Sequence, residues 1–423
     1  MVRDLLIFIL KILAKATLWR YRPTVVGLTG SVGKTSSKEA IFAVLKNKFN
    51  VRRNQKNYNN ELGVPLTILG QETGGQSFFH WLKVIIAGSL GILYTRNYPE
   101  ILVLEMGADK IGDIAYLVSF VRCYIGVVTA IGAIPVHVEF FQGAEQVAQE
   151  KANLIKSLDK DGWAVLNFDD ERVRAMATKT KAKVFGYGFH PDADLQASQL
   201  EAHLDDLSQA AISFKVDYLG SNVPLRLTGL LGAHQICPVL AAVAVGLIFK
   251  MNLVEISQAL KNYQLPPGRL QLIKGIKNSW VIDDTYNASP IATLAALEVL
   301  AKTKGRKIAV LGDMLELGSF SEEAHRQVGA KAAQSADLLL TVGERSLFIV
   351  EQARKGGLAE DKIFHFANSE EAARVLQNLI QEGDIILIKG SQSIRMEKIV
   401  KEIMAEPERA SELLVRQEKA WLK

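Results

Sequence analysis

The sequence predicts an α/β protein, built from a central P-loop domain with a mostly parallel sheet and a C-terminal Rossmann-like α/β domain. Three observations lead to this prediction. Apolar runs of strand length alternate with helical patterns along most of the chain. A glycine-rich loop joins the first of these runs to a helix, and a Pro-Pro-Gly break at 266–268 separates two series of such units.

The first series predicts a sheet of short, buried, mainly parallel strands. Each expected strand ends at polar or glycine residues; the strands cover 24–30, 100–108, 125–132 and 162–170. Helical spacing covers 36–48 and 144–158. Residues 184–229 carry short β-rich pieces with few helical signals, so we expect a small antiparallel excursion there.

The alternation of strands and helices restarts after the Pro-Pro-Gly break. The expected strands lie in "WVIDDTYN", "KIAVLGDM", "DLLLTVG", "KIFHFA" and "DIILIKGS". We therefore divide the chain into an apolar N-terminal helix (1–22), a central domain (23–265) and a C-terminal domain (266–423).

The composition is that of a globular protein. Hydrophobic residues make up 48% and charged residues 22% of the 423 positions, enough for two or three cores. The 50 basic and 45 acidic residues are spread along the chain and leave a net charge of +5, which argues against a nucleic-acid partner. Cys123 and Cys237 are too few for a disulfide framework and indicate a reducing cytoplasm.

Two apolar segments raise the question of whether the protein contacts a membrane. Residues 5–19 are apolar but are interrupted by Lys11 and Lys15, so they are too short and too charged for a spanning helix. No small-residue cleavage site follows them, which argues against a signal peptide. We expect a cytoplasmic monomer in which residues 1–20 and 78–94 either pack on the body or contact the inner face of the membrane.

The loop "TGSVGKTS" follows an expected strand and opens an expected helix, which is the context that a phosphate-binding loop requires. Gly30 and Gly33 let backbone N–H groups face an anion. Lys34 adds a positive charge, and Thr35 offers a hydroxyl to Mg²⁺. Although Leu28 stands where the strict pattern has glycine, the loop predicts a nucleotide site rather than a plain turn, and hence a central ATPase domain.

Three further residues have both a structural and a chemical interpretation. Glu105 ends an expected strand, where a buried carboxylate favours a Mg²⁺ role, although it could equally cap a helix. His137 alone is a weak signal. Lys151 shares a helical segment with Glu145 and Glu150, and by default would be their solvated ion-pair partner.

Taken in order along residues 23–400, several segments resemble the Mur ligase family. They are "TGSVGKTS" (29–36), "NYNNELGVP" (57–65), "LEMGA" (104–108), His137 followed by "QEKANLI" (149–155), "PPGR" (266–269), "DDTYNASP" (283–290), "LGDMLELG" (311–318) and "KGSQSIRME" (389–397). The sequence matches the family's phosphate loop, T-G-[ST]-x-G-K-[ST], in full. This pattern does not require glycine at position 28, so Leu28 agrees with it. The last three segments are most similar to the members that add D-alanyl-D-alanine.

The resemblance implies ATP and Mg²⁺ as cofactors and a role for each matching residue. The implied ATP contacts are Gly30, Ser31, Val32, Gly33, Lys34, Thr35, Ser36, His234, Arg269, Asp284, Tyr286 and Asn287. The implied metal ligands are Thr35, Glu105, His137 and Lys151, the lysine being carbamylated and so turned from a cation into an anion. Asn59, Asn60 and Lys389 are the implied substrate contacts, and Lys34, His137 and Lys151 are implied in catalysis.

The implied reaction is ATP-dependent amide-bond formation in peptidoglycan synthesis. The carboxylate of a nucleotide-linked peptide attacks the γ-phosphate of ATP, and the amine of D-alanyl-D-alanine then attacks the acyl phosphate. A sister ligase acting on another acid and amine, and a nucleotide-binding scaffold without the chemistry, are the alternatives. The presence of Thr35, Glu105, His137 and Lys151 together argues against the scaffold.

The sequence also departs from the family's pattern. Only about 22 residues precede the first expected strand, where such members carry a uridine-binding domain. We therefore expect that the uridine group is held differently, that a partner supplies this surface, or that the substrate is not the usual one. Pro238 stands where an asparagine near adenine is typical. Gln392 replaces a common arginine, with Arg395 nearby, and residues 78–94 lack a clear counterpart.

Overall fold

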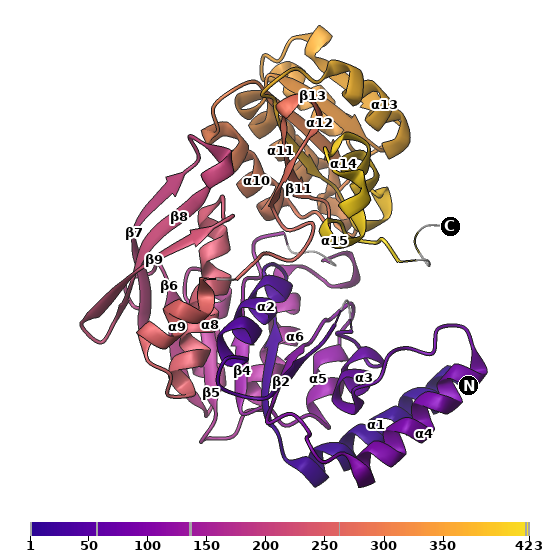
Figure 1. Cartoon of the computed structure of the whole chain (residues 1–423), viewed down its shortest axis with the longest axis vertical. Coiled ribbons are helices and arrows are strands. Elements are labelled where there is room, and N and C mark those ends of the chain that lie inside the picture. Colours follow the sequence, from indigo (N-terminus) through magenta and orange to yellow (C-terminus); the bar gives the residue numbers. More distant parts are fainter. Residues whose placement is uncertain (1, 56–57, 135–137, 262, 419–420, 422–423) are drawn as a thin grey trace.

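The computed structural model describes the chain except for residues 1, 56–57, 135–137, 262, 419–420 and 422–423. Two α/β bodies follow one another along the chain, and a pair of helices projects from the first of them (Figure 1). The first body contains a nine-stranded sheet and the second a six-stranded sheet, both mainly parallel. The predicted fold class is confirmed.

The nine-stranded sheet has the order β2-β3-β1-β4-β5-β6-β7-β8-β9. Its strands are β1 (Thr24–Thr29), β2 (Val51–Arg53), β3 (Ile101–Glu105), β4 (Ile125–Val128), β5 (Trp163–Asn167), β6 (Lys183–Gly188), β7 (Leu195–His203), β8 (Ala211–Tyr218) and β9 (Ser221–Thr228). Strands β1 to β7 pair in parallel, whereas β7, β8 and β9 pair antiparallel. The predicted antiparallel excursion is therefore an extension of the same sheet.

Helices cover both faces of this sheet. They are α2 (Lys34–Leu45), α3 (Gly63–Leu69), α5 (Asp113–Val118), α6 (Ala144–Lys156), α7 (Glu171–Arg174), α8 (Ile236–Ile248) and α9 (Leu253–Leu260). Helix α8 is apolar on all sides, and it is buried between α2 and the sheet. On the other face, α5 and α6 pack over β1, β3 and β4. Helices therefore cover both faces of the sheet, and the carboxyl end of β1 lies at the edge between these two helical layers.

The six-stranded sheet has the order β10-β11-β15-β12-β13-β14, with only β10 antiparallel to its neighbour. Its strands are β10 (Gln271–Lys274), β11 (Trp280–Asp284), β12 (Lys307–Gly312), β13 (Leu338–Val342), β14 (Ile363–Phe366) and β15 (Ile385–Lys389). Its helices are α10 (Pro290–Lys302), α11 (Ser321–Ser335), α12 (Leu347–Lys355), α13 (Ser369–Leu379), α14 (Glu397–Ile403) and α15 (Ala410–Leu413). Each strand predicted after the Pro-Pro-Gly break is present.

The projecting pair consists of α1 (Val2–Tyr21) and α4 (Phe78–Tyr94), which lie side by side against α3 (Figure 1). Leu10 of α1 and Val84 of α4 form a small core with Leu66 of α3. The Tyr21 hydroxyl donates to the Gly91 carbonyl at 2.8 Å. The inner faces of both helices are thus packed on the body. Among the described helices, none has the length and apolar content needed to cross a bilayer.

The packing of α1 on the body can be measured. Leu10 is fully buried in the small core, so Leu10→Ala should lower the free energy of unfolding by about 2–4 kcal/mol. Ile12 lies on the same helix but is 48% exposed, so Ile12→Ala should cost less than about 1 kcal/mol. Denaturant unfolding followed by intrinsic fluorescence gives both values. Equal costs for the two substitutions would contradict the packing described.

Candidate active site

The glycine-rich loop joins β1 to α2 in a conformation that depends on its glycines. Gly33 has φ 84° and precedes the first residue of α2. A Cβ atom on Gly30 would lie 1.9 Å from the Thr129 hydroxyl oxygen, so the backbone of the loop is pressed against the end of β4. No side chain caps α2, and the N–H groups of its first turn therefore face outward with the positive end of the helix dipole.

The two residues that follow β4 hold the loop in place. The amides of Ser31 and Val32 donate to the Ala130 carbonyl at 2.7 and 3.1 Å, and the Thr129 hydroxyl donates to the Val32 carbonyl at 2.7 Å. In this arrangement the backbone of Ser31 and Val32 shapes the loop. The amides available to an anion are those at the start of α2, from Gly33 to Ser36.

Lys34 is the cation of the loop. Its Nζ donates to the Gly30 carbonyl at 2.7 Å and to the Ser31 carbonyl at 3.4 Å, so the side chain arches over the loop. Burial lowers the pKa of Lys34, and the positive charge of Arg269 lowers it further, whereas the carboxylates of Glu105 and Asp109 raise it. An anion bound in the loop would favour the charged form of this amine.

Glu105 lies at the carboxyl end of β3, next to the loop, as predicted. Its carboxylate is buried and accepts from the Thr35 hydroxyl at 3.2 Å and from the Asn59 side-chain amide at 3.1 Å. Lys38 Nζ lies 3.9 Å from it. These contacts do not cap a helix, so that alternative is wrong. Carboxylate and hydroxyl oxygens held this close are ligands that suit Mg²⁺.

Lys151 is buried on the inner side of α6, and the solvated ion pair considered from sequence is wrong. Burial lowers its pKa to about 7, with a smaller contribution from the positive charge of Lys34; Glu150, Asp109 and Glu105 act in the opposite direction. The neighbouring Glu150 is also buried, because its carboxylate accepts from the Gly112 and Ile114 amides at the start of α5. Near neutral pH the Lys151 amine is therefore substantially unprotonated.

His137, the remaining implied metal ligand, lies outside the described residues. Within the described part of the chain, no group of three or more His, Cys, Asp or Glu side chains is placed to hold a metal ion. The oxygen ligands that the structure does bring together are those of Thr35 and Glu105.

The C-terminal domain adds a cation to the loop. Arg269 lies just after the Pro-Pro-Gly break, and its Nη2 donates to the Thr35 hydroxyl at 3.4 Å. Its guanidinium stacks 3.8 Å from the ring centroid of Tyr286. The Tyr286 amide donates to the Gly268 carbonyl at 3.1 Å, which fixes the loop after β11 against the hinge.

The other residues predicted in this domain form a second, adjacent group. Asp284 pairs with Lys389 at 2.7 Å, and Lys389 also donates to the Asn287 carbonyl at 2.9 Å. Lys389 is 2% exposed, and its contacts hold the carboxyl ends of strands β11 and β15 together. His234, in contrast, belongs to the central domain, where it lies in the short turn before α8 and is exposed.

Asn60 takes a structural role as well as a place in the cleft. Its side-chain oxygen accepts from the Leu62 and Gly63 amides at 3.2 and 3.0 Å, which fixes the start of α3. Asn59, by contrast, faces Glu105. Asn59 therefore contacts the Glu105 carboxylate, whereas Asn60 stabilises the wall of the cleft.

Several functional contacts had no clear sequence signal. Thr129 under the loop is one. Arg416 is another: its guanidinium donates to the Thr285 and Tyr286 carbonyls at 2.5 and 3.0 Å and pairs with buried Glu397 at 2.8 Å. Arg416 thus fixes the segment that carries Tyr286, which in turn stacks on Arg269. The two bonds from Arg416 to the carbonyls join residues 130 and 131 positions apart, and Thr129 lies 97 positions from Val32, separations that no local pattern reveals.

A cleft of about 1050 Å³ lies between the two bodies. Its wall includes Thr35, Asn60 and Leu66 from the central domain and Arg269, Tyr286 and Gln392 from the C-terminal domain. Arg395, in contrast, is tied to Glu397 and to the Trp421 carbonyl. Pro238, which replaces the asparagine typical near adenine, lies 3.8 Å from the Cβ position of Gly33, so it packs beside the loop.

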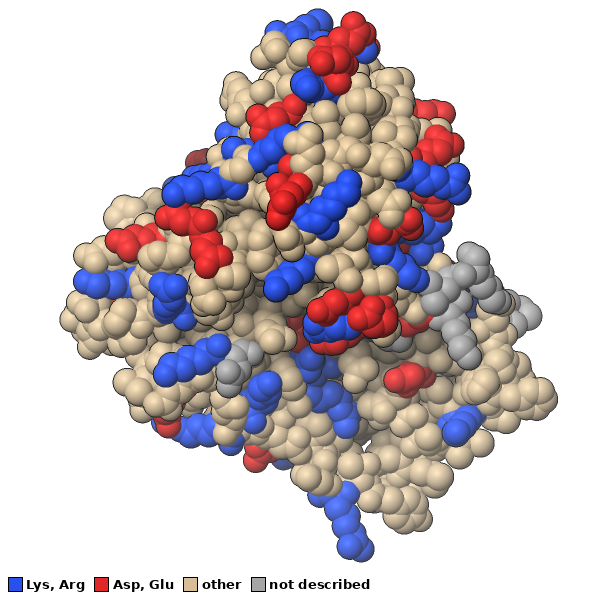
Figure 2. Space-filling model, turned by 45° about the horizontal axis from the view of Figure 1, so that its top comes forward, with Lys and Arg blue, Asp and Glu red and all other residues tan. Residues whose placement is uncertain are grey.

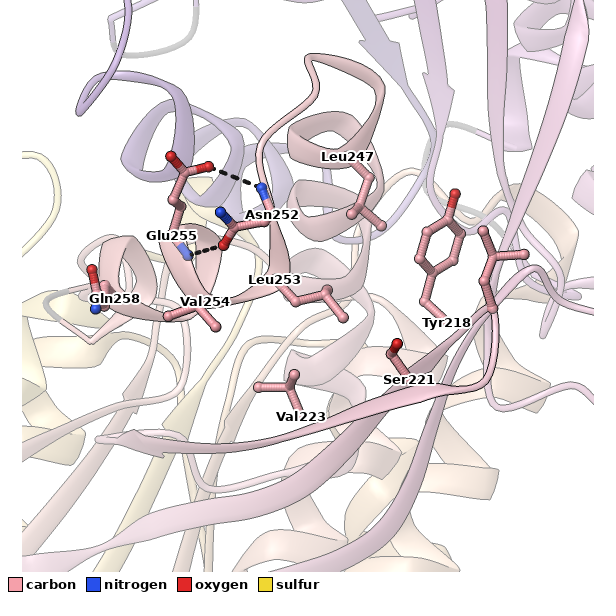
Figure 3. Close-up of a pocket in the computed structure, with 10 residues that line it drawn as sticks. Tyr218, Ser221, Val223, Leu247, Asn252, Leu253, Val254, Glu255 and Gln258 are labelled. Carbon is pink, nitrogen blue, oxygen red and sulfur yellow. Dashed lines mark hydrogen bonds between the residues drawn. The ribbon is translucent and has the colours of Figure 1, made fainter.

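A shallower groove of about 650 Å³ lies between the β8–β9 hairpin and α9 (Figure 3). Leu253, Val223 and Leu247 line it, and its Asn252 and Glu255 side chains bond each other's backbone amides at the start of α9. These polar groups are used to cap the helix. The other polar side chains that line the groove are Tyr218, Ser221 and Gln258, and none of the residues predicted for the site lies in it.

The residues in the cleft suit a nucleotide phosphate and Mg²⁺. Ser31 Oγ of the phosphate loop and Arg269 Nε at the wall of the cleft are buried donors that have no hydrogen-bond partner among the described residues. Both belong to groups that already contact the loop or Thr35. A phosphate oxygen would satisfy such donors, and the Thr35–Glu105 pair supplies oxygen ligands for the metal.

Comparison with known proteins identifies relatives over nearly the whole chain. Residues 90–246 match the family model "Mur ligase middle domain", and residues 268–392 match "Mur ligase, glutamate ligase domain". The UDP-N-acetylmuramoyl-tripeptide–D-alanyl-D-alanine ligase of Bacillus subtilis is 31% identical over 398 residues, which cover 93% of this chain and 79% of the relative. That of Escherichia coli is 33% identical over 388 residues, covering 89% and 76%.

A solved structure shares the fold. The MurF ligase from Thermotoga maritima in complex with ADP has a TM-score of 0.78 at 27% identity, and the match covers 95% of this chain and 84% of that one.

The pKa of Lys151 leads to a prediction for the metal-free protein. Only a neutral amine reacts with CO₂, giving a carbamate and a proton, and the neutral fraction rises as pH passes upward through about 7. At constant dissolved ¹³CO₂ we therefore expect a protein carbamate signal in ¹³C NMR that grows between about pH 6 and 8.

The matched control is Lys156, which is exposed at the end of the same helix. Lys151→Met should remove the signal, and Lys156→Met should leave it unchanged. A signal that survives Lys151→Met would contradict the assignment.

Proposed function

The chain belongs to the Mur ligase family, whose members are ATP-dependent ligases that use Mg²⁺, and from this premise we propose that it adds D-alanyl-D-alanine to a UDP-N-acetylmuramoyl-tripeptide. One observation carries the proposal. The Thr35 hydroxyl lies within hydrogen-bond distance of both the Glu105 carboxylate and the Arg269 guanidinium, so groups from both domains meet at the end of the phosphate loop. The relatives that match over both domains are named for this reaction.

The first step joins the acid to phosphate. A carboxylate oxygen of the tripeptide attacks the γ-phosphorus of ATP, the bond to the β-phosphate oxygen breaks, and ADP leaves. Lys34 and the first amides of α2 hold the phosphates, while Arg269 offsets charge from the opposite side of the cleft. Mg²⁺ bound at Thr35 and Glu105 would reduce the repulsion between the carboxylate and the triphosphate.

The second step forms the amide. The amine nitrogen of D-alanyl-D-alanine attacks the acyl carbon, the bond from that carbon to the phosphate oxygen breaks, and the nitrogen loses a proton. Phosphate leaves with one oxygen of the original carboxylate. The cleft between the domains is large enough for both peptides, and its wall combines the α3 region with the hinge at Arg269.

The lowered pKa of Lys151 supports its proposed carbamylation. A protonated lysine beside the loop would repel the metal, whereas the carbamate carries a negative charge and two oxygen ligands. We propose His137 as a further ligand on the resemblance alone. We also propose a monomer, as the sequence analysis expects, in a reducing cytoplasm, in keeping with its two free cysteines.

The test is phosphate release by the purified chain with ATP, Mg²⁺, UDP-MurNAc-tripeptide and D-Ala-D-Ala, each omitted in turn. We expect release to require all four, with the pentapeptide product seen by mass spectrometry. Lys34→Ala and Lys151→Ala should each lower turnover by about a thousandfold or more, because each removes charge from the transferring phosphate or its metal. Bicarbonate should not rescue the second variant.

The control is Lys156→Ala, which removes an exposed lysine from α6 and should leave turnover within about twofold. Release that proceeds without either peptide would contradict the ligase assignment. Product formed from a different acid or amine, with none from this pair, would replace it by a sister reaction.

A further inference from the structure

The outer faces of α1 and α4 carry an unusual concentration of exposed apolar side chains. Of the 21 large hydrophobic side chains exposed among the described residues, 11 lie on these two helices. On α4 they form a stripe at helical spacing, formed by Phe79, Leu82, Ile86, Leu90 and Leu93. Soluble monomers rarely expose a contiguous apolar patch of this kind, and such patches mark interaction surfaces.

The stripe on α1 continues the same surface. Leu5, Phe8, Ile12 and Trp19 recur every three to seven residues and are 48–73% exposed. The two helices are parallel neighbours, since the end of α1 at Tyr21 bonds to Gly91 and Ile92 near the end of α4. In Figure 2 the lower right corner of the molecule, where this pair projects, is largely free of charged side chains. We call the outer faces of α1 and α4 the apolar plate.

The charges on the two helices of the apolar plate and at their ends are mainly positive. Residues 1–22 and 77–97 contain seven lysines and arginines but a single acidic residue, Asp4. Lys15, Arg22, Lys83 and Arg96 are exposed beside the stripes. Trp19 and Tyr94 lie at the end where Arg22 and Arg96 also lie, and aromatic and basic residues together favour the boundary between lipid headgroups and acyl chains.

From this surface we propose that the apolar plate is a peripheral docking site for an anionic lipid bilayer, with α1 and α4 lying flat in the headgroup region. No described helix is suited to cross a bilayer, so the helices lie on it. A second copy of the chain fits less well, because a two-fold interface would bring two basic rims together. The inference goes beyond the ligase reaction and does not depend on it.

The plate is close to the cleft. Leu66 of α3 lines the cleft and also packs on Leu10 and Val84, the inner residues of the two plate helices. One short helix therefore separates the bilayer-facing surface from the cleft. Docking by the plate would hold the cleft beside the membrane surface.

The test uses the full chain and sedimentation with vesicles of phosphatidylcholine, with and without phosphatidylglycerol. We expect binding to the anionic vesicles that weakens as salt is raised. The triple variant Phe79→Glu, Ile86→Glu, Leu90→Glu should bind at least about a hundredfold more weakly, because it places charges where apolar side chains insert. Lys15→Gln, Lys83→Gln and Arg96→Gln should each cost about fivefold.

The matched control is Leu219→Glu, Val254→Glu, Leu347→Glu, which changes the net charge equally at exposed apolar residues far from the plate. It should bind like the unaltered chain. The proposal is overturned if the unaltered chain does not bind anionic vesicles, or if both triple variants lose binding equally. It is also overturned if sedimentation without lipid shows a dimer that only the plate variant dissociates.

Phosphate release in lipid-free solution separates this proposal from the ligase assignment. The plate variant should retain it, because none of its three changes touches the cleft. Full activity with lost vesicle binding supports both proposals, and vesicle binding by a chain that forms no amide supports the plate alone.

Discussion

The site depends on the buried carboxylate of Glu105 and on the contacts that this carboxylate makes. It is buried at the end of β3, where an unpaired charge would cost several kcal/mol, and it is stabilised by the Thr35 hydroxyl, the Asn59 amide and the nearby Lys38 ammonium. These partners come from α2 and from the loop before α3. A single negative charge therefore aligns the phosphate loop with the wall of the cleft.

The second domain reaches this carboxylate through Thr35. Arg269 donates to the same hydroxyl, stacks on Tyr286, and so connects to the segment held by Arg416 and Glu397. The C-terminal tail thus positions a residue at the phosphate loop without touching it. In physical terms the hinge is not a free linker: its arginine is oriented by contacts from three separate parts of the chain.

The parts predicted well from the sequence were those with local causes. The glycines of the loop and the strand-terminal position of Glu105 follow from neighbouring residues, and so do the βα units on either side of the Pro-Pro-Gly break. The burial of Lys151 could not be predicted from the sequence of its own helix, because it depends on how α6 packs over β1 and β4. Thr129 and Arg416 act through hydrogen bonds between distant segments, and the exposed faces of α1 and α4 emerge only once their inner faces are packed.

The central claim is that the cleft activates a carboxylate by transferring phosphate to it. The direct measurement uses tripeptide substrate with ¹⁸O in the reacting carboxylate and mass analysis of the phosphate released. If an acyl phosphate forms and the amine displaces it, each phosphate carries one ¹⁸O, because the C–O bond breaks in the second step. Phosphate without ¹⁸O would mean that water, and not the carboxylate, attacks ATP, and the ligase mechanism would be contradicted.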